Sequence, residues 1–230
     1  MVTFSVPVSA GNKHLRVAEE LFRLSVPRRA VVLAGSRNRQ VPDKACTALL
    51  NAFSRHGFSF FVGDAKGVDK CFRKAISTNP CKYRSLVACA FNRRAEYSFS
   101  NGLLATKVVP ENLPPKAALH RRTVWMVKRF CMVLLFPEDP VTGRWGKGSA
   151  LAFRTALYHI KPVFVVSSMP PKDSIHYLLL PANLFNVVDG FWVVPHPYGE
   201  GDTCDEEWKR GVNSKDKKSK RGVLPGLLSF

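Results

Sequence analysis

Short apolar runs that alternate with helical patterns constrain the fold of this chain more than any other feature. The clearest runs are roughly five to seven residues long and lie at 30–34, 58–62, 85–90, 130–136 and 162–166. Near-continuous apolar runs of this length are typical of parallel strands that are buried on both faces. We therefore predict an α/β fold, a Rossmann-like three-layer sandwich with a mostly parallel central sheet and helices on both faces.

The segments between these runs contain the expected helices. Apolar residues recur at helical spacing in 43–57, 68–76, 117–129 and 149–159. The proline-containing segment 91–116 is expected to be irregular, and the residues 187–188 and 192–194 are weaker strand candidates.

We expect three parts along the chain. Residues 1–28 form an N-terminal extension with a short helix over Lys13–Leu24, residues 29–198 form the Rossmann-like domain, and residues 199–230 form a basic, flexible tail. No apolar run approaches the roughly 18 residues of a membrane span. The charged residues near the N-terminus follow the apolar ones, which is the wrong order for a secretory signal. A cytoplasmic protein with no membrane partner is expected.

Charge points to a polyanionic partner. Lysine and arginine number 35 against 17 acidic residues, which gives a net charge of +18. Residues 201–230 hold seven basic and five acidic residues, so a net charge of +16 belongs to residues 1–200. A folded body this positive repels itself, and a nucleic acid offsets that repulsion.

Three of the predicted strands end at glycine-containing turns. In open parallel sheets, ligands bind at the carboxyl ends of the strands, where backbone N–H groups of the following helices converge. One such turn is weak evidence, but three at the same edge indicate a phosphate or nucleotide site. The expected binding residues are Gly35, Ser36 and Arg37 in the first turn, Gly63, Asp64, Lys66, Gly67 and Asp69 in the second, and Gly146, Lys147, Gly148 and Ser149 in the third.

Each turn has a plainer interpretation as well. The Ser36 hydroxyl can donate to a phosphate and Arg37 can pair with it bidentately, but a tight turn with a solvated arginine fits equally. Asp69 either contacts a ribose hydroxyl or stabilises the start of the next helix. The third turn is not a Walker A loop, because Gly148 follows Lys147. The first turn lacks G-x-G-x-x-G, so we expect no NAD, FAD or other cofactor.

Other chemistry has little support. The six cysteines show no C-x-x-C spacing, the six histidines are not paired at metal-ligand spacing, and no G-x-S-x-G motif occurs. No metal site and no catalytic residue is therefore expected. Among the aromatic residues, Trp125 is expected in the core, and Trp145, in a glycine-rich turn, is the best candidate for an exposed base-stacking residue, with Tyr97 and Phe99 as others.

The three turns, in this order, resemble the SLOG superfamily, in its DNA-processing protein A-like or YspA-like branch. The likeness covers roughly residues 29–168 and is carried by Gly35-Ser36-Arg37, by Gly63-Asp64-Ala65-Lys66-Gly67-Val68-Asp69, by the basic pair Arg121-Arg122, and by Gly148-Ser149 before the strand at Lys161-Pro162-Val163. The resemblance implies a Rossmann-like fold that binds single-stranded DNA or nucleotides. It makes a recombinase a candidate partner and a homodimer a candidate assembly.

One departure bears on catalysis. The phosphoribohydrolase branch of the superfamily has a glutamate in the helix after the third turn, and this chain has Ala152 in that register. An alanine cannot act as an acid or a base. The resemblance therefore favours a protein that is not an enzyme.

The leading hypothesis is a DNA-binding protein, with single strands favoured, that acts in DNA processing or recombination. Phosphates would lie on the turn at Gly35-Ser36-Arg37, and the positive field would come from Lys66, Arg121, Arg122 and Lys147. The alternative is a small-nucleotide sensor or nucleotide-processing enzyme that uses the same turns. A third reading is an interaction module that keeps the nucleotide fold only as a scaffold.

Overall fold

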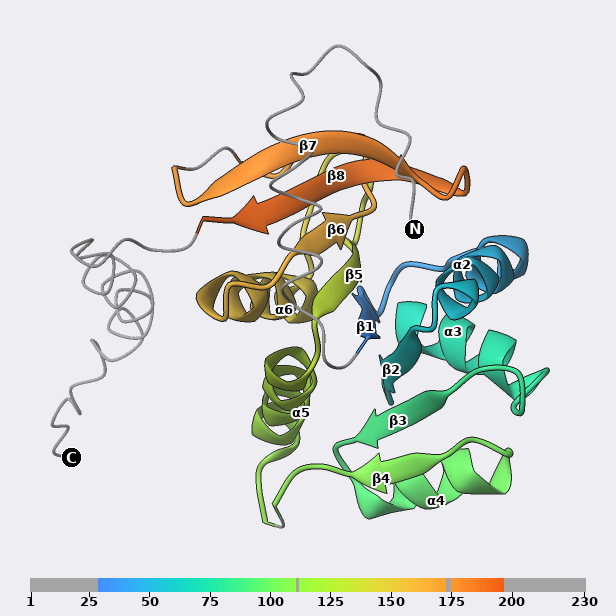
Figure 1. Ribbon diagram of the computed structural model, residues 1–230. Helices are drawn as coiled ribbons and strands as arrows, with labels where there is room; N and C mark the ends of the chain where they lie inside the picture. The colour runs from blue at the N-terminus through green and yellow to red at the C-terminus, as the bar shows by residue number, and fades with distance from the viewer. Residues whose placement is uncertain (1–28, 111, 173–174, 197–230) are drawn as a thin grey trace, which may run out of the picture. The chain divides into compact units, whose positions relative to one another are not determined.

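A single mixed sheet organises the part of the chain that the structure describes. The computed structural model describes residues 29–110, 112–172 and 175–196, so the expected helix at Lys13–Leu24 and the expected tail lie outside it. The eight strands have the order β4-β3-β2-β1-β5-β6-β8-β7 (Figure 1). They are β1 Ala30–Gly35, β2 Ser59–Gly63, β3 Ser85–Cys89, β4 Ala105–Lys107, β5 Met132–Phe136, β6 Val163–Val165, β7 Tyr177–Leu184 and β8 Val188–Pro195.

The first six strands are parallel, and the β7–β8 hairpin is antiparallel. The helices are α2 Asp43–Arg55, α3 Val68–Ser77, α4 Asn92–Ser100, α5 Pro115–Arg129 and α6 Lys147–Tyr158. None of these described helices is long and apolar enough to span a membrane.

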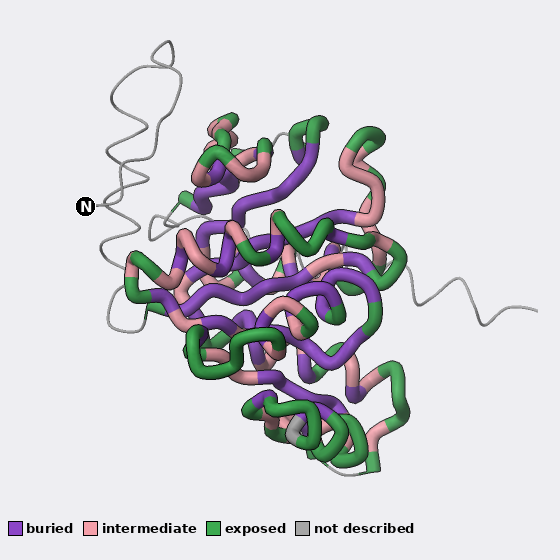
Figure 2. The backbone as a smooth tube through the Cα atoms, turned by 90° about the vertical axis from the view of Figure 1, so that its right-hand side faces the viewer, coloured by how far each residue is buried: buried purple, intermediate pink, exposed green. Residues whose placement is uncertain are grey.

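Side chains that alternate along the central strands divide the core into two layers. From β1, Val31 and Leu33 pack with α2 and α3, whereas Val32 packs with α5 and α6. All three of these β1 residues are fully or almost fully buried. Figure 2 shows buried backbone, coloured purple, through the centre of the molecule. A strand covered on both faces tolerates no polar residue, which explains the uninterrupted apolar runs. The predicted three-layer α/β sandwich is confirmed.

The prediction that residues 91–116 are irregular is wrong, because this segment contains α4 and β4. Most of α4 is exposed, and Ala95 is its contribution to the main core, so its sequence lacks a clear apolar stripe. The strand β4 has three residues at the edge of the sheet. Elements this short and this exposed leave too weak a pattern to detect.

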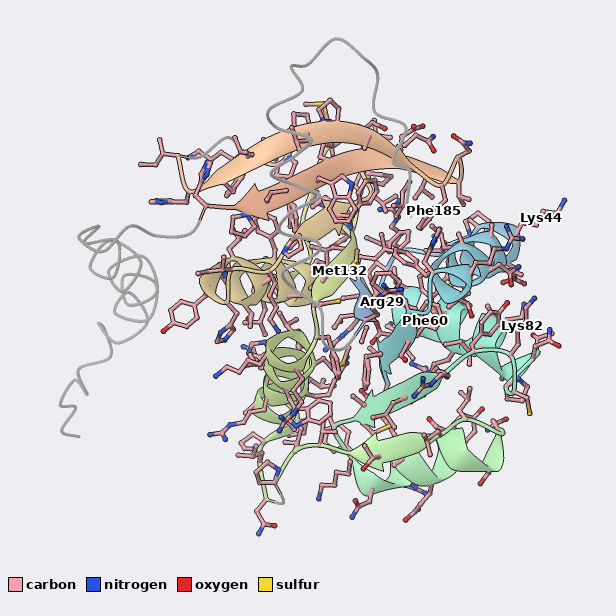
Figure 3. All side chains as sticks on the ribbon, viewed as in Figure 1. Arg29, Lys44, Phe60, Lys82, Met132 and Phe185 are labelled. Atoms are coloured by element: carbon pink, nitrogen blue, oxygen red, sulfur yellow. The ribbon has the colours of Figure 1, made fainter. Side chains whose placement is uncertain are left out.

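The hairpin of β7 and β8 was predicted only in part. Its turn has Phe185 and Asn186 at φ values of 57° and 58°, and the Val187 N–H donates to the Leu184 carbonyl at 3.1 Å. Two successive positive φ angles match a hairpin turn for which asparagine and glycine are the usual residues. Phe185, labelled in Figure 3, tolerates this backbone, and its ring packs edge-on against Phe53 with centroids 4.9 Å apart.

The outer strand of the hairpin, β7, forms one open edge of the sheet. Its central residue Pro181 is exposed and pairs in register with Phe191 of β8. Apolar residues flank Pro181, but proline argues against a strand in any sequence-based assignment. The sequence analysis therefore missed β7.

We expect the cysteines to report on this fold. Burial raises the pKa of the Cys46 thiol to about 12 and that of Cys89 to about 11, whereas Cys81 is exposed. A thiol-alkylating reagent at pH 8 should therefore modify Cys81 in the native protein and leave Cys46 and Cys89 unmodified until denaturant is added. Peptide mapping by mass spectrometry measures each site. Native labelling of Cys46 or of Cys89 that equals that of Cys81 would contradict the arrangement of α2 or of β3, respectively.

Candidate functional site

The three predicted turns meet at one edge of the sheet. β1 pairs in parallel with β2 on one side and with β5 on the other. Strands β2, β3 and β4 are added in turn on one side of β1. Helix α5 then leads back to β5, which pairs with the other side of β1. The order of the strands therefore reverses direction between β1 and β5. Such a switch point is the usual ligand site of an open α/β sheet. The expectation that the three turns share an edge is confirmed.

Ser36 joins the three strand ends. Its N–H donates to the Phe136 carbonyl at 2.9 Å, and its carbonyl accepts from the Val68 N–H at 3.2 Å. Its hydroxyl accepts from the Asn38 N–H at 3.1 Å. With 4% of its surface exposed, Ser36 fixes the direction in which the next residue, Arg37, leaves the sheet.

Close backbone packing explains two of the glycines in these turns. Gly67 has a φ of +73°, and a Cβ atom there would lie 2.4 Å from the Ser36 carbonyl oxygen. A Cβ atom on Gly35 would lie 2.6 Å from the Val68 Cγ2 atom. Side chains at these positions would separate the first turn from the second.

Beneath these turns, Arg122 of α5 forms a buried cluster of charges with Asp64 and Asp69. Its guanidinium lies 3.2 Å from a carboxylate oxygen of each. Asp64 also accepts the Ala90 N–H at 3.1 Å, and Asp69 accepts the Ala65 N–H at 3.2 Å. At most 7% of the surface of each of the three charged residues is exposed. These hydrogen bonds offset part of the desolvation cost of the buried ion pairs, while the Arg122 Nε atom has no hydrogen-bond partner among the described residues.

Gly63 makes room for this cluster. A Cβ atom on Gly63 would lie 1.6 Å from the Arg122 Nη1 atom and 2.3 Å from the Asp69 carboxylate. The Gly63 carbonyl also accepts a hydrogen bond from Arg73, whose pKa is lowered by burial. The structure thus places Gly63, Asp64, Asp69 and Arg122 in a charged support under the second turn.

A basic groove opens above this support, between α3 and α4. This α3–α4 groove has a volume of about 570 Å³. Its only acidic lining residue among the described residues is Asp64, whose side chain is 1% exposed and already paired with Arg122. Its basic lining residues are Arg37, Lys66, Lys70, Arg73, Lys74 and Arg94, and the others are Ala65, Ser77, Tyr97, Ser98, Asn101, Leu103 and Leu119.

The basic residues of the groove differ in how far they are already neutralised. Lys74 pairs with the exposed Asp43 at 2.6 Å, and Arg94 lies 3.4 Å from Asp64. Within the described part of the chain, Arg37, Lys66 and Lys70 make no ion pair, and all three are exposed. These three cations are therefore available to an anionic ligand.

The third turn lies on the other side of Ser36. A Cβ atom on Gly146 would lie 3.4 Å from the Ser36 hydroxyl and 3.4 Å from the Glu138 carboxylate. Helix α6 begins at Lys147, and its N-cap residue is Gly146, which has no side chain to cap the helix. Lys147 and Gly148 are exposed, and Ser149 is buried with a hydroxyl that has no hydrogen-bond partner among the described residues. None of these residues lines the α3–α4 groove.

The structure also shows where the remaining residues singled out from the sequence lie. The prediction of an exposed Trp145 is wrong, since the indole is half-buried and packs on Phe153 with centroids 4.9 Å apart. Trp125 packs against the core as expected. Arg121 is exposed on α5 but does not line the groove. Ala152 lies on the buried face of α6. The described residues contain no group of three or more potential metal ligands.

Most residues of the α3–α4 groove were not predicted from the sequence. Lys70, Arg73 and Lys74 follow the second turn at helical spacing, so a basic face on the predicted helix was a signal that could have been used. Tyr97 was predicted only as one of several base-stacking candidates, and neither it nor Arg94 could be placed on a groove wall, because α4 itself was not predicted. Glu138 was also missed, and it lies at the switch point with Arg144 at 2.8 Å and Asn38 at 3.3 Å.

Comparisons with known proteins give matches of structure only. No protein-family model and no curated protein sequence matches the chain. Its structure is similar to that of DNA processing protein A from Helicobacter pylori, a protein that binds single-stranded DNA, at 20% identity and a TM-score of 0.46, over 65% of this chain and 69% of that one. It is also similar to DNA processing protein A from Streptococcus pneumoniae at 15% identity and a TM-score of 0.46, over 68% of this chain and 53% of that one.

The buried charge cluster should be essential for folding. Replacing Arg122 with methionine leaves Asp69 without its ion-pair partner and Asp64 with only the half-exposed Arg94, which should lower the free energy of unfolding by about 3–5 kcal/mol. Urea denaturation followed by circular dichroism measures the loss. Arg121→Met is the matched control, because Arg121 is exposed on the same helix, and it should change stability by less than about 0.5 kcal/mol. Similar losses in the two variants would contradict the buried cluster.

Proposed function

We propose that this protein binds single-stranded DNA through the sugar–phosphate backbone, with the strand lying in the α3–α4 groove. The observation that carries the proposal is the composition of the groove: six basic side chains, with a single acidic residue that is buried and paired. Phosphates are bound by this kind of surface, and the counterions they release supply much of the binding free energy.

The first two turns bring the available cations to one end of the groove. Arg37 follows β1, Lys66 follows β2, and Lys70 lies in the first turn of α3. The N-terminus of α3, with Gly67 as a cap that makes no side-chain hydrogen bond, adds the positive end of a helix dipole. A phosphate held between Arg37 and Lys66 would be close to this helix end. Asp64, Asp69 and Arg122 act in this proposal by positioning the second turn.

The biological role follows from the sequence resemblance and stays a proposal. A member of the SLOG superfamily in its DNA-processing branch would act in DNA processing or recombination. A recombinase partner and a homodimer belong to the same proposal. The exposed Arg121 and Lys147 would extend the positive surface beyond the groove, and Gly148 and Ser149 would contribute the N-terminal turn of α6.

Salt provides the first test of DNA binding. If the three unpaired cations each neutralise one phosphate, log K should fall with log[salt] at a slope of about −2, from roughly −0.7 for each phosphate of a single strand. Fluorescence anisotropy with a labelled oligonucleotide at 50–200 mM salt measures the slope. An affinity that does not change over this range would contradict the proposal.

Mutations locate the contact. Arg37→Ala and Lys66→Ala should each weaken binding severalfold and to a similar degree for every base sequence, because phosphate contacts carry no base information. Each should also make the salt slope shallower by about 0.7. The matched controls are Arg154→Ala on α6 and Lys44→Ala on α2, whose exposed side chains do not line the groove (Figure 3 labels Lys44). Losses in the controls as large as those in the groove would contradict this location.

A free nucleotide is the second candidate ligand, and one observation favours it. Ser149 has 1% of its surface exposed, lies in the first turn of α6, and keeps a hydroxyl without a described partner. An unpaired buried hydroxyl costs stability, so a ligand phosphate at the start of α6 would recover that cost.

The Ser149→Ala variant tests this second candidate. Removing an unpaired hydroxyl should leave the free protein as stable or up to about 1 kcal/mol more stable. The same change should abolish any thermal stabilisation that a nucleoside monophosphate gives to the unmodified protein. Stabilisation by the nucleotide that is equal in the two proteins would place the nucleotide elsewhere.

A further inference from the structure

The α3–α4 groove contains an aromatic side chain that the fold does not need. Tyr97 of α4 is 72% exposed and lines the groove. The only other exposed aromatic residue among those described is Tyr158 on α6, which is 57% exposed and lies outside the groove. An aromatic ring this exposed buries little apolar surface and contributes little to folding. Tyr97 is therefore available to a ligand.

The two walls of the groove differ in chemistry. The α3 wall is cationic, with Lys70, Arg73 and Lys74 in the lining. The α4 wall has one cation, Arg94, which is already paired with Asp64, and it presents Tyr97 beside the small polar residues Ser98 and Asn101. A strand that lies in this groove would thus have its phosphates towards α3 and its bases towards α4.

Contacts within the protein hold the α4 wall in place. The Tyr97 carbonyl accepts a hydrogen bond from the Asn101 side-chain amide at 2.7 Å, near the end of the helix. One turn earlier, the Arg94 guanidinium lies 5.2 Å from the centre of the Phe91 ring and 3.4 Å from Asp64. Asp64 belongs to the buried charge cluster, so the position of α4 is tied to the same support as the second turn.

We infer that Tyr97 is a stacking platform for an unpaired base, and that it makes the groove selective for single strands over duplexes. The inference rests on the proposed function and adds a residue that determines specificity. In a duplex every base is stacked between neighbours and paired, so its face is not available to a side chain. In a single strand a base can rotate onto the ring, and stacking tolerates any base because each has a π-face.

Oligonucleotides with and without bases test the inference. Tyr97→Ala should weaken binding of an oligo-dT strand by roughly 10- to 100-fold, which is the range for losing one stacked base. The same variant should bind an abasic strand of equal length as well as the unmodified protein does. Tyr97→Phe keeps the ring and should bind oligo-dT within about threefold of the unmodified protein. Tyr158→Ala, the matched control on α6, should change neither affinity.

Duplex DNA of equal length gives a second readout. The unmodified protein should prefer the single strand, and Tyr97→Ala should lose most of that preference. An equal loss on oligo-dT and on the abasic strand would overturn the inference, because Tyr97 would then support the backbone or the fold. No loss on oligo-dT would overturn it as well.

The abasic strand also separates this inference from the proposed function. Steep salt dependence on the abasic strand, with no effect of Tyr97→Ala on oligo-dT, keeps the phosphate groove and rejects the platform. Binding of the abasic strand that does not respond to salt rejects the phosphate groove itself. A protein that binds none of the three ligands rejects both.

Discussion

The buried pairing of Arg122 with Asp64 and Asp69 is the interaction on which the rest of this edge of the molecule depends. It connects α5 on one face of the sheet with the turn after β2 and with the start of α3 on the other face. Three charges that pack together below the surface must keep their geometry, because none of them can return to water without leaving a partner unpaired. The turn that carries Lys66 is fixed by this requirement.

The same pairing changes how the second turn is understood. A motif with two aspartates, a lysine and two glycines invites the view that each polar residue contacts the ligand. In the structure Asp64 and Asp69 pair with Arg122, and the absence of a side chain at Gly63 leaves the space that this pairing needs. Lys66 is exposed and lines the groove. The same short motif thus contains residues that fix the conformation of the loop, Asp64 and Asp69, and a residue that the loop exposes to a ligand, Lys66.

The layered sheet could be predicted from the sequence because β1, β2 and β5 are near-continuous apolar runs, and those of β1 and β2 end at glycine. The meeting of their three turns followed from parallel pairing alone. Elements with weak patterns could not be predicted: α4 is mostly exposed, β4 has three residues, and β7 contains Pro181. The groove depends on α4, so its second wall was missed together with the helix. The partners of Arg122 were also out of reach, since Asp69 lies 53 positions away along the chain.

Pro181 in the outer strand of the hairpin has a consequence for assembly. Open sheet edges invite a strand from another molecule, because their unpaired N–H and carbonyl groups form a ready template. A proline in the middle of β7 removes one donor from that template and keeps its ring exposed there. Growth of this sheet from copy to copy is thereby disfavoured at the β7 edge. A chain with so much apolar strand sequence gains protection from aggregation by the same residue that obscured the strand.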